Sequence, residues 1–206
     1  MSPTRTLAPR QLDALREVAN IAGGHAATAL SQLMDRRVMI SVPQLSIATL
    51  DEAPKVLGYG GRRVAVVAMH VLGDLSGHLV FLMLEADAST LSDLLLSRVP
   101  LTSTGFDELA QSSVTEAGNI LGGAYAGALG SLMGKVVMLS IPAFGIEPAD
   151  GVLLRQRSLV GSAAELALCI ETSLTIDGAE PQLHGHMLLM PSKASVTAIL
   201  EALRLA

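Results

Sequence analysis

The sequence predicts an α+β fold made of two similar halves that share one sheet and one hydrophobic core. Three observations lead to this prediction. Of the 206 residues, 50% are hydrophobic and 16% are charged, which is too much apolar surface for a disordered chain. A stretch of about thirty residues recurs 99 positions further along the chain. Both copies then continue with the same succession of patterns, from helix to β-branched runs to a shorter helix.

The repeat is clearest where one copy reads Glu17-Val-Ala-Asn-Ile-Ala-Gly-Gly24 and the other reads Glu116-Ala-Gly-Asn-Ile-Leu-Gly-Gly123. Of the 31 positions from Asp13 to Pro43, 14 are identical to the residue 99 positions later. Typical amino-acid usage would give about two such identities by chance. We therefore expect one domain over residues 1–206, with repeat one at about 9–98, repeat two at about 104–206, and a pseudo-twofold axis relating them.

Each copy is expected to begin with a long helix, because apolar residues recur there at helical spacing. These helices are predicted at about 9–35 and 104–133, with Pro9 in the first turn of one and a capping box of Thr104 and Asp107 on the other. The other expected elements are strands at 38–42, 64–69, 79–84, 136–141, 166–170 and 187–190, and closing helices at about 87–97 and 192–204.

A glycine pair lies inside each long helix, Gly23-Gly24 in the first and Gly122-Gly123 in the second. Each of these glycines costs about 1 kcal/mol relative to Ala in a helix interior. Small residues follow both pairs, and neither pair follows a strand in the manner of a phosphate-binding or dinucleotide-binding loop. We therefore expect the pairs to allow the close approach of a neighbouring helix or strand.

Composition and charge argue against several classes of function. The net charge is −5, no basic run is present, and only 2% of the residues are aromatic, so nucleic-acid binding is not expected. The single cysteine, Cys169, lies in an apolar run and is expected to be a buried strand residue. The N-terminus has no apolar signal core and no uncharged apolar run reaches 18 residues, so we expect a cytoplasmic protein without a membrane span.

A stripe of three polar residues, spaced i, i+4 and i+7, runs along one face of each long helix. The stripes are Asp13, Glu17 and Asn20 in the first helix and Ser112, Glu116 and Asn119 in the second. Because the apolar residues lie largely on the other side, both stripes are expected to face solvent. An ordinary solvated face would be free to change, yet the Glu and the Asn are identical in both copies. The stripes are therefore candidate functional sites.

The chemistry of a Glu and an Asn on one helix face is limited but specific. A carboxamide is no general base at neutral pH, but it donates and accepts hydrogen bonds at once and can hold a water molecule in a chosen direction. A glutamate beside it can pair with a lysine of a partner. Neither stripe contains a Ser-His, Cys-His or metal-ligand cluster, so it could only complete a site on another protein. An amide plays this part in phosphoryl transfer when it aligns the attacking water.

At these residues the chain resembles the CheC/CheX/FliY chemotaxis phosphatases, whose pattern is (Asp or Ser)-x3-Glu-x2-Asn-x22-Pro. The pattern is matched at every spacing in both copies, by Asp13, Glu17, Asn20 and Pro43 and by Ser112, Glu116, Asn119 and Pro142. Two complete motifs resemble CheC more than CheX, which carries one. The resemblance implies a CheC-like pseudo-twofold duplication, in which two helix–strands–helix repeats share one largely antiparallel sheet with long helices on it.

The resemblance also implies an activity, because proteins of this family hydrolyse the aspartyl phosphate of the response regulator CheY. Carried over, the two asparagines would orient the attacking water and the two glutamates would bind the regulator's active-site lysine. Asp13 and Ser112 would support either the helix face or the docking, and Pro43 and Pro142 would have a structural role, ending the strand beneath each helix. Mg²⁺ would be supplied by the regulator, so the chain is expected to need no cofactor of its own. The receptor deamidase CheD is a further partner that the resemblance suggests, with no residues assigned.

Two other hypotheses remain open at this point. One is a non-catalytic adaptor that binds the regulator or CheD without hydrolysis, although an adaptor has no need of the amide. The other is a small-molecule or metal enzyme, which would require a concave site. His184 and His186 lie on one strand face, but no third and fourth ligand stands near them at a suggestive spacing, so we interpret them as polar residues at a strand edge.

Overall fold

The computed structural model describes residues 8–42, 44–50, 52–97, 106–160, 166–178 and 182–205. The elements of the first half are α1 (Pro9–Met34), β1 (Val38–Ser41), β2 (Leu45–Thr49), α2 (Ala53–Leu57), β3 (Arg63–Gly73), β4 (Gly77–Leu84) and α3 (Glu85–Leu95). Those of the second half are α4 (Glu108–Met133), β5 (Val137–Leu139), β6 (Ala143–Pro148), α5 (Ala149–Val160), β7 (Leu166–Ile176), β8 (Leu183–Pro191) and α6 (Lys193–Leu205).

The strands form one eight-stranded sheet in the order β1-β7-β8-β4-β3-β5, with β2 also paired to β7 and β6 also paired to β3. Every strand pair described is antiparallel. The halves meet at the centre, where Phe81 of β4 is opposite Met187 of β8. The outer strands are exchanged between the halves, since β1 and β2 pair with β7 while β5 and β6 pair with β3. The predicted α+β duplication around one sheet is confirmed.

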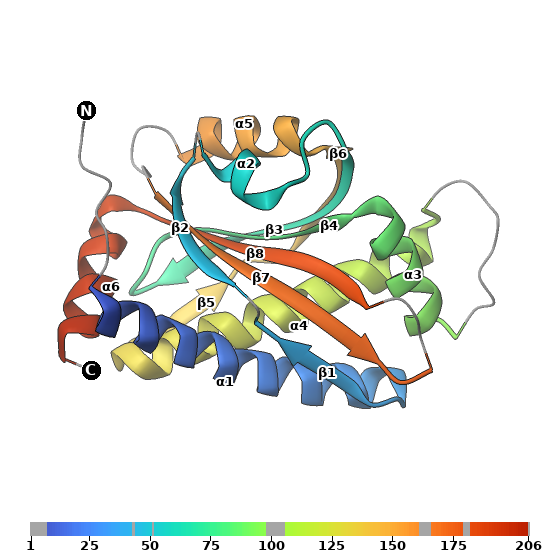
Figure 1. Cartoon of the computed structure of the whole chain (residues 1–206), viewed down its shortest axis with the longest axis horizontal. Helices are drawn as coiled ribbons and strands as arrows, with labels where there is room; N and C mark the ends of the chain where they lie inside the picture. The colour runs from blue at the N-terminus through green and yellow to red at the C-terminus, as the bar shows by residue number, and fades with distance from the viewer. Residues whose placement is uncertain are drawn as a thin grey trace.

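The sheet separates two helical layers (Figure 1). The long helices α1 and α4 lie side by side on one face and run in opposite directions, with α6 near the start of α1 and α3 near the start of α4. The short helices α2 and α5 cover part of the other face. A larger hydrophobic core fills the space under α1 and α4, and a smaller one, which includes Cys169, lies under α2 and α5.

The long helices lie where their periodicity predicts them, and their N-termini differ. Pro9 occupies the first turn of α1, as expected. In α4 the N-cap is Asp107, whose side chain accepts a hydrogen bond from the Ala110 backbone N–H at 2.7 Å. Asp107 is therefore the cap itself and not the third helical residue that the predicted capping box requires. Thr104 and the predicted joint at 98–104 lie outside the described residues.

Four elements were not predicted from the sequence: β2, α2, β6 and α5. The predicted strand at 136–141 is shorter in the structure and ends at Leu139, because β3 turns from pairing with β5 to pairing with β6 beyond that point. The strands predicted at 64–69 and 166–170 extend to Gly73 and Ile176, where they carry the exchanged β5 and β1.

The glycine pairs are only half explained by close packing. A Cβ at Gly122 would lie 2.7 Å from Cε of Met69, so the predicted close approach is confirmed there. A Cβ at Gly23 would make an ordinary contact with Ile40 at 3.4 Å. At Gly24 and Gly123, however, a Cβ would meet nothing within 4 Å, so the prediction is wrong for these two.

In the part of the chain that the structure describes, no helix combines the length and the hydropathy needed to cross a bilayer.

Candidate functional site

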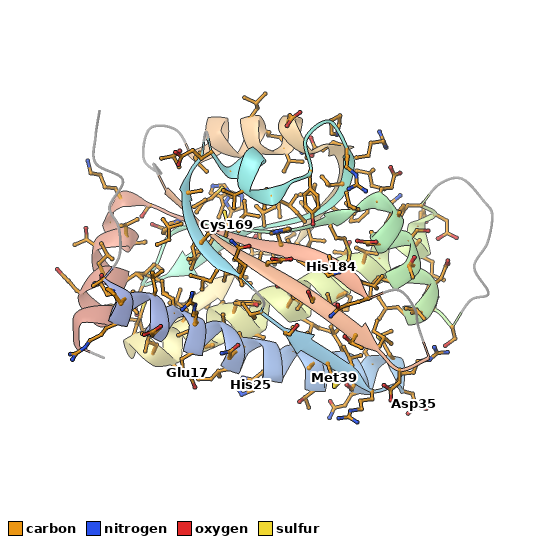
Figure 2. All side chains as sticks on the ribbon, viewed as in Figure 1. Glu17, His25, Asp35, Met39, Cys169 and His184 are labelled. Atoms are coloured by element: carbon orange, nitrogen blue, oxygen red, sulfur yellow. The ribbon has the colours of Figure 1, made fainter. Side chains whose placement is uncertain are left out.

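The two motifs lie on α1 and α4, in the helical layer that forms one outer surface of the molecule (Figure 1). Figure 2 shows Glu17 and His25 along the side of α1 that points away from the sheet. The opposite side of α1 carries the buried residues Leu15, Ala19, Ala22 and Ala26. The amphipathic spacing of the helix therefore places its polar stripe toward solvent, as predicted.

In the first motif, Asp13, Glu17 and Asn20 are all exposed. The Asp13 carboxylate lies 3.4 Å from the Arg16 guanidinium, with side chains 70% and 59% exposed. An ion pair this open to water contributes little to stability. Asp13 is therefore available to a partner, and its loss would leave the fold intact.

In the second motif, Ser112 and Glu116 are exposed, but Asn119 is half-buried. The expectation that this stripe faces solvent therefore holds for Ser112 and Glu116 and only in part for Asn119. Eleven of the 26 residues of α4 are buried, whereas eight of the 26 residues of α1 are buried. Gly118 and Gly122 let α4 approach β3 closely, since a Cβ on either would collide with Val67 or Met69 at 2.7 Å.

The functional groups of both motifs are free of internal partners among the described residues. The Asn20 and Asn119 amides form no hydrogen bond with another described side chain or backbone group, and the Glu17 and Glu116 carboxylates form no ion pair with one. Other polar residues of these helices bond within the fold, such as Thr28 to Gly24 O and Ser113 to Ser92. The stripes thus present a carboxylate and an amide, one turn apart, that the fold itself does not use.

The prolines of the two motifs can be described only in part. Pro142 is half-buried and lies in the short connection between β5 and β6, which fits the structural role expected of it. Pro43 lies outside the described residues, between the end of β1 and the start of β2.

The histidines of β8 have structural partners. β8 lies between β7 and β4, so the expectation of a strand edge is wrong. His184 Nδ1 is 3.1 Å from Ser173 Oγ, and His186 Nδ1 is 2.9 Å from the Tyr59 hydroxyl. Burial, with His184 nearby, lowers the pKa of His186 to about 4, so this imidazole is neutral at pH 7. Within the described ranges, no group of three or more His, Cys, Asp or Glu residues is arranged to hold a metal.

A hollow beside β3, β4 and β6 is the kind of concave feature that a small-molecule enzyme would need. Its polar lining comes from His70, His78, Ser140, Glu147 and Arg155, and none of the six stripe residues contributes to it. Arg155 is paired with Glu147 there. The hollow and the stripes are therefore separate features of the molecule.

Two features of the stripes escaped the sequence analysis. Ile21, next to Asn20, is 44% exposed, and an isoleucine also follows Asn119. The exposed Gly24 and Gly123 follow the two asparagines by four residues, on the same helix face. The only signal in the sequence was that the Ile and the Gly are each identical in the two copies. The structure is needed to show which of the glycines lie in the core and which lie on the surface.

Comparison with known proteins supports the resemblance to the CheC-type family. The CheC-like family model matches residues 11–47, which contain the first motif. Over 205 residues, 98% of either protein, the chain is 29% identical to the CheY-P phosphatase CheC of Bacillus subtilis. The resemblance to the CheC-type family is confirmed. The flagellar motor switch phosphatase FliY of B. subtilis is 27% identical over 66% of this chain and 35% of its own length.

A solved structure gives the same result for the fold. The crystal structure of Thermotoga maritima FliY superposes with a TM-score of 0.79 and 25% identity, covering 97% of this chain and 98% of that one. The CheC-like architecture therefore extends over nearly the whole chain, beyond the segment that the family model matches.

Proposed function

We propose that this protein is a phosphatase that hydrolyses the aspartyl phosphate of a CheY-like response regulator. The observation that carries the proposal is the pair of exposed helix faces, each with a Glu and an Asn that the fold does not use. Similarity over 98% of the chain to a protein named CheY-P phosphatase supports it. The regulator is then the principal partner, and the reaction is expected in the cytoplasm.

In this proposal Asn20 and Asn119 act inside the regulator's active site. Each amide accepts a hydrogen bond from a water molecule and aligns its oxygen with phosphorus. A bond forms between that oxygen and phosphorus while the bond from phosphorus to the aspartyl oxygen breaks. The products are the free carboxylate and inorganic phosphate, and the released proton passes to solvent or phosphate. The asparagine supplies orientation only, because a carboxamide takes up no proton at neutral pH.

The remaining stripe residues would hold the two proteins together. Glu17 and Glu116 lie one turn before the asparagines and would pair with the regulator's active-site lysine. Asp13 and Ser112, a further turn away, would contact the rim of the docking surface. We propose that Mg²⁺ is bound by the regulator and not by this chain. CheD stays a predicted second partner without assigned residues.

The exposure of the two asparagines favours α1 as the more accessible site. Asn20 is exposed and Asn119 is half-buried, so a regulator reaches the first amide with less rearrangement of the surface. We therefore propose that the α1 site accounts for the larger share of the activity.

The proposal is tested by following the decay of phosphorylated regulator with and without the protein. The wild-type chain should shorten its lifetime, and the double variant Asn20→Ala/Asn119→Ala should not, while both bind the regulator. Gln32→Ala is the matched control, because it removes an exposed amide from α1 about three turns beyond Asn20. An adaptor would bind the regulator without shortening its lifetime, and acceleration by the double variant equal to that of wild type would refute the assigned roles.

A further inference from the structure

Gly24 and Gly123 are glycines that the fold does not require. Both are exposed, and a Cβ built on either would meet nothing within 4 Å. Neither is among the glycines with positive φ, so an L-residue could adopt the same backbone conformation. Each nevertheless weakens its helix by about 1 kcal/mol relative to Ala. Packing and backbone geometry therefore leave the absence of a side chain at these two positions unexplained.

Neighbouring glycines of α4 show the contrast. A Cβ at Gly118 would lie 2.7 Å from Cβ of Val67, and one at Gly122 would lie 2.7 Å from Cε of Met69. A side chain at either position would force Val67 or Met69 of β3 to shift. Gly123 directly follows Gly122 but faces outward, so the requirement that explains one does not extend to the other.

The position of the exposed glycines relates them to the proposed site. Each follows the asparagine of its motif by four residues, which places it one turn, or about 6 Å, further along the helix and about 40° around it. The same relation holds on α1 and on α4, although the buried residues of the two helices differ. Two helices in different packing environments thus share an exposed position without a side chain, one turn beyond the proposed catalytic amide.

We propose that Gly24 and Gly123 are positioning residues, which keep the helix surface beside Asn20 and Asn119 free of side chains so that the aspartyl-phosphate-bearing regulator can lie directly against the helix backbone. This inference rests on the proposed function and adds a steric requirement to it. The amide must reach the phosphoryl group at the bottom of the regulator's site, and a side chain one turn away would hold the two surfaces apart. The cost of each glycine to helix stability is then offset in the complex.

Backbone flexibility is the alternative explanation for a glycine in a helix, and side-chain size separates the two. Ala and Leu both remove the conformational freedom of glycine and have similar helix propensities. If the site requires a flexible backbone, Ala and Leu should therefore weaken the interaction with the regulator equally. If the site requires space for the regulator, Leu should weaken the interaction more than Ala, because Leu extends further from the helix.

The test uses the full chain with both asparagines intact, as the double variants G24A/G123A and G24L/G123L. Rates of decay are measured over a range of phosphorylated regulator concentrations, and binding is measured with regulator carrying beryllofluoride. We expect the Ala variant to raise KM and Kd about threefold and the Leu variant to raise them about tenfold or more, as for overpacking of a contact. Thermal unfolding should show both variants at least as stable as wild type.

Gly151→Ala is the matched control, because Gly151 lies on α5, on the other side of the sheet. Its new Cβ would make only an ordinary contact with Glu147, at 3.7 Å. It should leave KM and Kd unchanged. Wild-type KM and Kd in the Leu variant, or equal effects of Ala and Leu, would overturn the inference while the proposed function stands. A wild-type chain that neither accelerates decay nor binds the regulator would overturn both.

Discussion

At the scale of single residues, the exposed and the buried polar groups of this protein have different tasks. Five of the six stripe residues of α1 and α4 are exposed and Asn119 is half-buried, and apart from the weak pairing of Asp13 with Arg16 they have no internal partner among the described residues. The buried polar groups are bonded to one another, as Tyr125 is to Thr172 at 3.5 Å. Stability therefore depends on the second group, and the proposed activity depends on the first.

His186 gives a prediction at this scale, about pH and stability. Burial lowers its pKa from about 6.5 in the unfolded chain to about 4 in the fold. Between these values the unfolded state binds the proton and the folded state does not, so the free energy of unfolding falls as the pH falls from about 6.5 to about 4. In His186→Gln this contribution is absent, and the decrease over that range should be smaller.

Urea unfolding of wild type and His186→Gln at pH 7.5 and pH 4.5 measures the difference. Other titrating groups, among them His78, whose pKa burial also lowers, are common to both proteins and cancel in the comparison. His25→Gln, an exposed substitution on α1, should show the wild-type pH dependence. An identical pH dependence in His186→Gln would show that this imidazole does not titrate as its burial implies.

Much of the candidate site could be predicted from the sequence, because helical spacing alone sets which residues share a face. The exposure of Asp13, Glu17 and Asn20 followed from the i, i+4, i+7 pattern. The partial burial of Asn119 did not follow, because it depends on the tertiary surroundings of α4 and not on helical spacing. The open space around Gly24 is likewise a property of tertiary packing, and a glycine carries no side chain whose pattern could reveal it.

At the scale of elements, α1 and α4 show that two helices related by a repeat can pack at different depths. Their sequences differ at the sites that face the sheet, where Ala19 of α1 corresponds to Gly118 of α4. Gly118 admits Val67 and brings α4 down onto β3.

A substitution at Gly118 tests this difference. Gly118→Ala should lower the free energy of unfolding by about 1–3 kcal/mol, because the new methyl group would collide with Val67. Gly123→Ala, five residues further along the same helix, should instead be neutral or stabilising by up to about 1 kcal/mol. Urea unfolding gives both values, and equal stability of the two variants would contradict the packing described.

The elements that sequence reasoning found are the long or strongly patterned ones. α1 and α4 have many turns over which the helical period repeats, and β4 and β8 each contain a continuous apolar run. The missed elements are short or weakly patterned. α2 has five residues, and the buried positions of β2, Leu45 and Ala48, are three residues apart, so neither element carries a clear period. Their structure comes from packing on β7 and not from local preference.

At the scale of the whole molecule, the exchange of outer strands links the two repeats. β1 and β2 of the first repeat depend on β7 of the second, and β5 and β6 depend on β3. The sequence could predict the duplication and the shared sheet. It could not predict this exchange, because strands of similar composition offer no local signal for which partner each will choose.

The exchange predicts that neither repeat folds alone as a monomer. A chain of residues 1–98 would leave β1 and β2 without β7 and would expose the pairing edges of β3 and β4. Expressed separately, residues 1–98 and 104–206 should each lack a cooperative unfolding transition or self-associate, and mixing them should restore a folded pair. Circular dichroism with sedimentation measures this outcome, and a folded, monomeric single repeat would contradict it.

The most direct measurement of the proposed activity is the decay rate of phosphorylated regulator when it is saturated with this protein. At saturation every regulator molecule is bound, so the overall affinity no longer contributes, and what remains is its distribution between the two sites and the step that consumes the phosphoryl group. Phosphorylated regulator should decay faster with the wild-type protein than alone. The Asn20→Ala variant should lose more of this acceleration than the Asn119→Ala variant, and with the double variant the regulator should decay at the rate that it shows alone. Saturated decay that is equally fast with wild type and with the double variant would contradict the role of the two asparagines.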